Sequence, residues 1–421
     1  MVFDNFASAQ SVFLWSAFGI AFVLGLVANK TNFCTMGAVS DWVNMGDTGR
    51  LRAWLFAIAI AILGVTIFEA MGKVNVTTTF PPYRQNLLVW AENILGGLMF
   101  GIGMTFASGC GNKSLVRLGA GNIKSLMVIL IIAVIAYFML NPFPGTDKTL
   151  FSVLFYGWIR PLATQLSTNQ DLGAMIFGAD KVALGRMVMG GLIGALLLIF
   201  VFKSRDFRTN FDNVLGGLVV GLAVLSAWYM TSNIMVHADT DTVTLQKFVD
   251  DWDLVAKPTD VKPAQAGPLA PQSFTFINPL GQTLGYAITG FNKTVLTFGI
   301  MAVFGVMAGS LLWSLIKRNF RFEWFASFRD FVNHFIGAIL MGFGGVLGMG
   351  CTIGQGITGF STLALGSILT FVSIVLGSAL TMKIQYYKMV YESDATFFKA
   401  FVTSLVDLKL LPAGMRSLEA V

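Results

Sequence analysis

Long apolar blocks separated by short polar loops dominate the pattern of this 421-residue chain. Each longer block approaches the ~20 residues that a helix needs to cross a hydrocarbon core of ~30 Å. Apolar and polar residues do not alternate along these blocks as they do in membrane strands. The pattern therefore predicts transmembrane helices, which fall at Ser11–Asn29, Ala53–Gly72, Ser125–Leu140, Ala183–Phe202, Val214–Thr231, Val295–Ile316 and Thr362–Met382.

The composition excludes most soluble classes of protein. Hydrophobic residues make up 55% of the chain and charged residues 12%, against roughly 45–50% and about 25% in soluble domains. A surface so poor in charge excludes a cytosolic enzyme, a nucleic-acid-binding protein and a disordered tail. The formal net charge of +6 fits the anionic inner face of a lipid bilayer better than nucleic acid. We expect an all-α polytopic membrane protein with one transporter domain over residues 1–421.

The charges of the loops predict the orientation of the spans. Four short loops are basic, and the positive-inside rule places them in the cytoplasm. The stretch 237–273 carries several aspartates and prolines instead, so we expect it to be an external polar loop. Residues 383–421 are expected to form a cytoplasmic tail, and the N-terminus is expected to be periplasmic. The basic loops contain Arg50 and Arg52; Lys113, Arg117 and Lys124; Lys203, Arg205 and Arg208; and Lys317, Arg318, Arg321 and Arg329.

Two glycine-rich segments match each other at a constant offset. They begin near Asn93 and Asn333, and each ends in a Gly-Cys pair. The cysteines are Cys110 and Cys351, and the other matched positions share their spacing (351 − 110 = 241). The loop charges make the two copies enter from opposite faces, as in transporters built from inverted repeats. The matched glycines are Gly96, Gly101, Gly103 and Gly109 in one copy and Gly337, Gly342, Gly344 and Gly350 in the other.

The residues after these two cysteines favour a break in each helix. Close packing explains glycines four residues apart, such as Gly97 and Gly101, but it does not explain the polar, glycine-rich residues that follow. Irregular backbone at membrane depth is tolerated only where it is buried or lines a cavity. We therefore expect Asn93–Asn122 and Asn333–Phe360 to form half-helices with re-entrant loops near the midplane.

The three cysteines are the main candidates for chemistry, although a single buried cysteine usually serves as a small packing residue. Their odd count and wide spacing, with only two histidines in the chain, indicate neither disulfides nor a metal site. A thiol is a weak, polarizable donor that suits a sulfur-bearing anion better than a cation. We expect no catalytic residue, metal or cofactor, and a substrate path through Cys34, Cys110, Cys351, Gly109, Gly350, Gln355, Asn112 and Lys113.

Three of the polar residues have two interpretations each. Lys113 and Arg117 follow Cys110 and would attract an anion, or they are ordinary charges of a cytoplasmic loop. Gln355 would hydrogen-bond a ligand, or it would satisfy carbonyl groups of its own loop. The residues alone do not decide between these interpretations.

Three motifs resemble the YeeE/YedE family of sulfur-compound transporters: Asn32-Phe-Cys34-Thr-Met-Gly, the segment from Gly96 to Cys110, and the segment from Gly342 through Cys351-Thr-Ile-Gly-Gln-Gly. The resemblance implies an hourglass-shaped bacterial inner-membrane protein that takes up thiosulfate or a related sulfur anion. It also implies that the substrate passes between the three thiols through S–H···S hydrogen bonds. Some members work with a small cytoplasmic sulfur carrier of the TusA type, so such a carrier is a candidate partner.

Two other functions compete with transport. One is a membrane sulfurtransferase that takes sulfur as a cysteine persulfide, which would need a thiol of low pKa, and neither histidine stands beside a cysteine in the sequence. The other is a sensor that binds a sulfur compound and signals through a partner. Transport of a sulfur anion is the leading hypothesis.

Overall fold

The computed structural model describes residues 1–238, 241–256, 260–264, 269–392 and 394–419. Within this part of the chain, nine helical segments are long and apolar enough to cross a membrane. The expectation of an all-α polytopic membrane protein is confirmed. The long helices are α1 (Phe6–Lys30), α3 (Gly49–Ala70), α4 (Trp90–Phe106), α6 (Ile123–Leu140), α9 (Val182–Phe202), α11 (Phe211–Asn233), α15 (Phe298–Ile316), α16 (Phe328–Leu347) and α17 (Leu365–Val390).

Shorter helices connect these spans or pack between them. Three of them follow a cysteine directly and are important for the site: α2 (Thr35–Ser40), α5 (Gly111–Gly119) and the turn that continues into the π-helix η7 (Gly354–Gly359). The other short elements are η1 (Asp41–Met45), η2 (Ser152–Tyr156), α7 (Gly157–Ile159), η3 (Arg160–Leu162), α8 (Leu172–Phe177), η4 (Ala179–Lys181), α10 (Arg205–Thr209), α12 (Leu245–Asp250), α13 (Trp252–Val255), α14 (Ile277–Ile288), η6 (Lys293–Val295), α18 (Phe397–Asp407) and η8 (Ala413–Met415).

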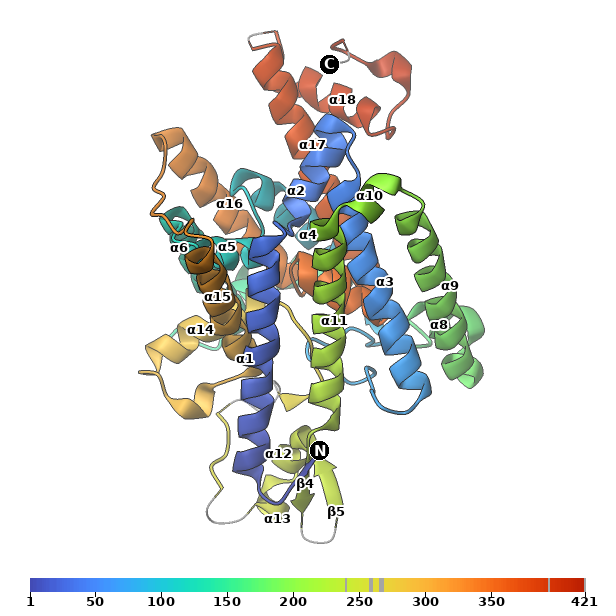
Figure 1. The fold of residues 1–421 in the computed structure, drawn as a ribbon, viewed down its shortest axis with the longest axis vertical. Helices are drawn as coiled ribbons and strands as arrows, with labels where there is room; N and C mark the ends of the chain where they lie inside the picture. The colour runs from blue at the N-terminus through green and yellow to red at the C-terminus, as the bar shows by residue number, and fades with distance from the viewer. Residues whose placement is uncertain (239–240, 257–259, 265–268, 393, 420–421) are drawn as a thin grey trace.

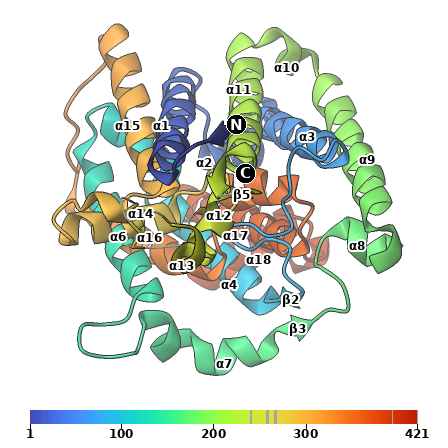
Figure 2. The same cartoon turned by 90° about the horizontal axis from the view of Figure 1, so that it is seen from below.

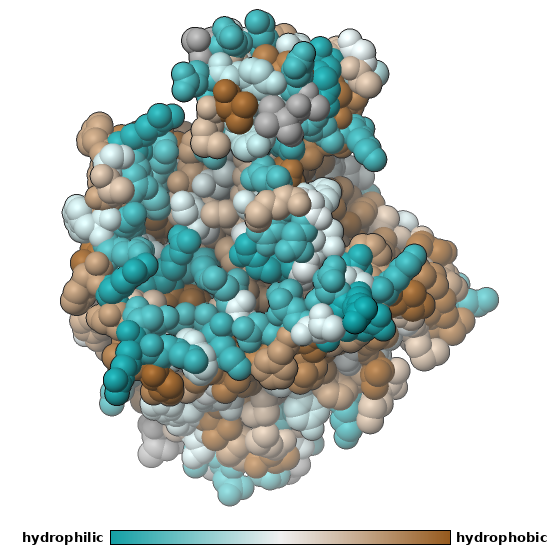
Figure 3. All heavy atoms as spheres, turned by 45° about the horizontal axis from the view of Figure 1, so that its top comes forward, coloured by the Kyte–Doolittle hydropathy of each residue, from teal (hydrophilic) through white to brown (hydrophobic). Residues whose placement is uncertain are grey.

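All four basic loops lie at one end of the helix bundle, which we call the basic end. The end of α1 meets the start of α11, where a Cβ atom on Gly216 would lie 2.9 Å from Thr31 Oγ1. The start of α6 meets the start of α16 through the Lys124–Asp330 ion pair of 3.0 Å. Figure 1 shows the N-terminus at the opposite end of the molecule and the C-terminal α18 beyond the basic end. The face turned forward in Figure 3 is largely polar, with apolar side chains at its flanks.

The stretch that the sequence indicates to be a polar loop is partly folded. Strands β4 (Met235–Ala238) and β5 (Asp241–Thr244) pair antiparallel, and β1 (Val2–Phe3) pairs parallel with β4. These strands, α12 and α13 cluster at the N-terminal end (Figure 1). A second small pairing joins β2 (Leu87–Leu88) to β3 (Thr164–Gln165). Seen along the bundle, η2, α7 and β3 lie at its periphery (Figure 2).

The two glycine-rich helices, α4 and α16, cross in opposite directions with glycine at their contact. A Cβ atom on Gly96 would lie 2.8 Å from the carbonyl oxygen of Gly344, and one on Gly103 would lie 2.6 Å from that of Gly337. In the sequence, Gly96 matches Gly337 and Gly103 matches Gly344. Replacing each glycine by its match therefore turns one contact into the other, as a two-fold axis between the helices would. The helices have 17 and 20 residues, so both are longer than half-helices. The inverted repeat stays a prediction that this pairing supports.

Two connecting segments run into the protein from the N-terminal end and pack over the residues that follow Cys351. We call these two segments the straps. The first contains Tyr83 and Arg84, and the second contains Phe274 and Thr275. The straps touch each other, because the N–H of Phe80 donates to the carbonyl of Pro271 at 3.1 Å. At least nine-tenths of the surface is buried for each of Tyr83, Arg84, Phe274 and Thr275. The loop that carries Cys351 is thus covered from this end.

Candidate functional site

Each cysteine follows the same backbone turn. Asn32, Ser108 and Met349 stand two positions before a cysteine and have φ values of 54°, 56° and 55°. This left-handed conformation closes a helix at its C-terminus, and it costs a non-glycine residue about 1–2 kcal/mol. Surrounding packing must therefore impose the turn at the ends of α1, α4 and α16.

The hydrogen bonds of these turns also match. The N–H of Gly109 donates to the carbonyl of Met104 at 2.9 Å, and the N–H of Gly350 donates to the carbonyl of Gly345 at 2.8 Å. Both bonds span six residues, as in a Schellman motif. The N–H of Phe33 makes the corresponding bond at the end of α1, at 3.2 Å. The cysteine then begins the next short helix, so all three thiols stand at helix N-termini.

The three cysteines are buried and converge from distant parts of the chain. Their side chains are 7% (Cys34), 2% (Cys110) and 0% (Cys351) exposed. Cys110 lies close enough to both other thiols for charges on them to interact. The Thr352 hydroxyl donates to Cys110 Sγ at 3.3 Å, which joins the two glycine-rich segments, and the N–H of Gly354 donates to Cys351 Sγ at 3.4 Å.

Lys113 is buried beside this cluster. It is 8% exposed, and its Nζ donates to Asn32 Oδ1 at 2.6 Å. The ammonium group lies within electrostatic range of Cys34 and Cys110. Among the residues that the structure describes, Lys113 forms no ion pair. Its burial shows that Lys113 does not sit at the surface as an ordinary loop charge would.

The glycines that precede Cys110 and Cys351 leave room for polar side chains. A Cβ atom on Gly109 would lie 3.0 Å from Lys113 Cγ and 3.8 Å from Arg117 Nη1. One on Gly350 would lie 3.3 Å from Gln355 Cγ. Small residues at these positions therefore allow longer side chains to approach the cysteines.

The two amide side chains of the candidate path are buried and only partly satisfied. Gln355 Nε2 donates to the carbonyl of Gly348 at 2.6 Å, so one half of this amide satisfies its own loop. The oxygen Gln355 Oε1 and the oxygen Asn112 Oδ1 have no hydrogen-bond partner within the described part of the chain. Buried polar atoms are usually hydrogen-bonded, so both oxygens are free to accept a bond from water or a ligand.

The sequence did not indicate the straps that cover Cys351. The Tyr83 hydroxyl donates to the carbonyl of Gly354 at 3.0 Å, and Arg84 Nε donates to that of Thr362 at 2.8 Å. The Thr358 hydroxyl donates to the carbonyl of Phe274 at 2.8 Å. No motif or hydropathy signal distinguishes these strap residues from an ordinary loop. Thr352, in contrast, was accessible to prediction, because it directly follows a matched cysteine.

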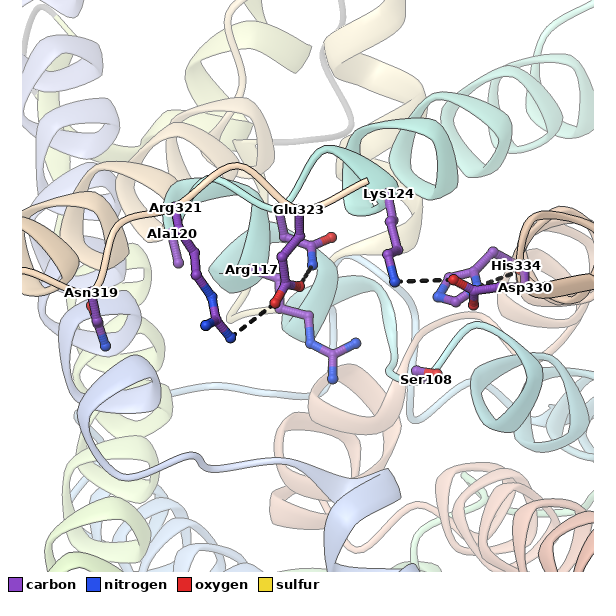
Figure 4. A pocket seen from close by; sticks show the side chains of 10 residues that line it. Ser108, Arg117, Ala120, Lys124, Asn319, Arg321, Glu323, Asp330 and His334 are labelled. Carbon is purple, nitrogen blue, oxygen red and sulfur yellow. Dashed lines mark hydrogen bonds and ion pairs between the residues drawn. The ribbon is translucent and has the colours of Figure 1, made fainter. Parts of the chain in front are cut away.

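A cavity of about 400 Å³ opens at the basic end. Ser108 and Arg117 line it, together with residues of α6, α16 and the segment between α15 and α16 (Figure 4). The other charged residues of the cavity are Lys124, Arg321, Glu323, Asp330 and His334.

A family model described as sulphur transport matches residues 30–380 of this chain. The chain belongs to the sulphur transport family. The matched range of this sulphur transport protein contains all three cysteines, both glycine-rich helices and the strap residues. The YeeE/YedE resemblance seen in the sequence is thereby confirmed.

Similar proteins carry transporter names. The protein is 23% identical over 378 residues to the thiosulfate transporter TsuA of Spirochaeta thermophila, and the match covers 87% of this chain and 97% of the relative. It is 22% identical over 371 residues to the thiosulfate transporter TsuA of Escherichia coli, and this match covers 84% of this chain and 90% of the relative. It is 25% identical over 203 residues to the probable transporter YedE of Escherichia coli, covering 45% and 41% of the two chains.

Proposed function

We propose that this protein is a permease that carries thiosulfate or a closely related sulfur anion across the bacterial inner membrane into the cytoplasm. The observation that carries the proposal is the convergence of Cys34, Cys110 and Cys351, each at the start of a short helix. Their likeness in backbone conformation argues for one shared role. The names of the similar proteins support thiosulfate as the substrate.

The chemistry of the cluster suits a divalent sulfur anion. Removing a dianion from water is costly unless donors replace its hydration shell. The helix N-termini at the cysteines offer backbone N–H groups and a positive dipole end, and Lys113 adds a full charge. Thiols are weak donors, so they bind the anion without holding it, as conduction requires. In this scheme the anion passes between Cys351, Cys110 and Cys34 while Gln355 Oε1 and Asn112 Oδ1 accept bonds from accompanying water.

We further propose that the basic end faces the cytoplasm and the N-terminal end faces the periplasm. The shared position of the basic loops supports this orientation. It makes 237–273 an external segment and 383–421 a cytoplasmic tail. A small cytoplasmic sulfur carrier of the TusA type would then dock at the basic end. A fluorescent protein fused after Val421 should fold and fluoresce, whereas a periplasmic alkaline phosphatase fused there should be inactive; the reverse result would contradict the orientation.

Uptake by cells that lack other sulfate and thiosulfate importers tests the proposed function. Cells that express the protein should grow on thiosulfate as sole sulfur source and accumulate the labelled anion, and cells with an empty vector should not. The same cells supplied with sulfate, sulfite or cysteine show which other sulfur sources are accepted. If expression in the membrane is verified and no sulfur anion enters faster than in the control, the proposed function is wrong.

A further inference from the structure

The cavity at the basic end contains one cation that stands apart from the other charges. Lys124 pairs with Asp330 at 3.0 Å, Arg321 pairs with Glu323 at 3.0 Å, and His334 Nδ1 also meets Asp330 at 3.0 Å. The remaining charged residue, Arg117, forms neither an ion pair nor a side-chain hydrogen bond with any residue that the structure describes. Figure 4 shows its guanidinium between the two pairs in this view, with no dashed line reaching it.

Arg117 and the buried Lys113 form a continuous positive site. They stand four residues apart on α5, which places them on one face of the helix. Side chains of a helix lean toward its N-terminus, and Arg117 Nη1 accordingly reaches back toward Gly109, next to Cys110. Lys113 lies within electrostatic range of Arg117 as well as of Cys34 and Cys110. Two neighbouring cations without an acidic partner, one of them buried, are costly unless an anion joins them.

We infer that Lys113 and Arg117 form a binding site for a sulfur-containing dianion at the cytoplasmic mouth of the cysteine cluster, with Arg117 holding the oxygens of its sulfonate group. Two positive charges match the two negative charges of thiosulfate. The planar guanidinium fork suits an oxyanion with several oxygens. With the sulfonate on Arg117, the terminal sulfur faces the thiols. This inference rests on the proposed function and names the residue that receives the anion as it leaves the cluster.

The second glycine-rich segment has no lysine or arginine at the positions that match Lys113 and Arg117. At the same offset of 241, Gly354 and Thr358 stand where Lys113 and Arg117 stand in the first copy. The second strap packs closely against the first of these positions: a Cβ atom on Gly354 would lie 2.4 Å from Thr275 Oγ1. The cationic site therefore belongs to the basic end alone.

Binding of labelled thiosulfate to the purified full-length protein tests the inference, with transport by the same variants measured in cells. Arg117→Gln should weaken binding at least tenfold, because both charge and fork are lost. Arg117→Lys should keep part of the affinity, with a loss of about threefold, since it retains the charge. Lys124→Gln is the matched control, because Lys124 lines the same cavity but is already paired, and its affinity should stay within twofold of wild type. Unlabelled sulfate should compete less well than thiosulfate, because it lacks the terminal sulfur.

The possible outcomes distinguish a failure of this inference from a failure of the proposed function. If the wild type transports thiosulfate and Arg117→Gln binds and transports it equally well, the inference is wrong and the permease remains. Equal losses in Arg117→Gln and Lys124→Gln would also overturn it, since the effect would then be the general charge of the mouth. If Arg117→Gln does not fold, Arg117→Lys decides: affinity unchanged from wild type overturns the inference. Absence of uptake by the wild type would refute the proposed function itself.

Discussion

The buried ion pair that anchors the first strap gives a quantitative prediction. Arg84 is 1% exposed and donates to both carboxylate oxygens of Glu69, at 2.6 and 2.9 Å, and to the carbonyl of Thr362 at 2.8 Å. Removing one partner of a buried pair costs about 3–5 kcal/mol, because the other charge is left unpaired. Arg186 lies 3.8 Å from Glu69 and offers partial compensation. We therefore expect Arg84→Met to lower the free energy of unfolding by about 3 kcal/mol.

Equilibrium unfolding of the purified protein in mixed detergent micelles measures this change. Glu69→Gln should be destabilised by a comparable amount. The double variant should lose less than the sum of the single losses, because neither buried charge then remains unpaired; we expect a coupling of at least ~1.5 kcal/mol. The matched control is Arg321→Met, which removes a pair whose arginine side chain is 78% exposed and should change stability by no more than about 1 kcal/mol.

The same variants test whether the straps seal the N-terminal end. A membrane-impermeant maleimide added from outside should label Cys351 faster in Arg84→Met than in the wild type, because the strap that carries Tyr83 is loosened. The reasoning fails if Arg84→Met unfolds like the wild type, or if the two single losses add without coupling. Unchanged labelling together with a large loss of stability would show that Arg84 holds the fold but does not cover the cysteine.

Three further predictions concern packing, acid and the C-terminal tail. Gly101→Ala places a Cβ atom against the backbone of α17 and should cost about 1–3 kcal/mol in the same unfolding assay, whereas Gly19→Ala, with open space around it, should be neutral or stabilising. Burial raises the pKa of Asp171, but its hydrogen bonds from Arg186 and the charges nearby outweigh this and hold the pKa below its ordinary value. Its stabilising contribution is therefore complete at neutral pH and lost only as pH falls below about 4, so Asp171→Asn should flatten the acid limb of a stability–pH curve. Asp407→Asn should release α18 from α17 and speed its removal by added protease, and equal cleavage rates would show that the tail is held elsewhere.

The spans were predictable because each apolar block is long and the loops between the blocks are polar. Ala183–Phe202, for example, differs by one residue from the observed α9. The end of α17 was less accessible, because the helix continues past Met382 to Val390. This extension carries Tyr387, which donates to Asp407 of α18 at 2.7 Å. A hydropathy pattern cannot detect support that comes from a polar contact with a later helix.

The candidate site was predictable where it depends on local sequence and hidden where it depends on distant contacts. The matched glycine-rich motifs draw attention to Cys110 and Cys351, and each of these cysteines follows a left-handed turn that closes its helix. The burial of Tyr83 and Phe274 depends on loops that fold back into the protein, and nothing local in the sequence encodes this. The pairing of β1 with β4 joins residues more than 230 positions apart, so the local sequence pattern predicts a loop in this region.

The initial rate of labelled thiosulfate uptake by Cys110→Ser and Cys110→Ala, at matched membrane expression, tests most directly whether the anion passes along the thiols. A hydroxyl also donates a hydrogen bond, so the serine variant should keep part of the rate. The alanine variant loses a bond to a charged group worth ~1.5–3 kcal/mol, which slows passage by roughly one to two decades if it falls on the barrier. A persulfide mechanism predicts instead that serine is as inactive as alanine. Full activity in both variants would show that Cys110 is a packing residue and would contradict a path through the cysteines.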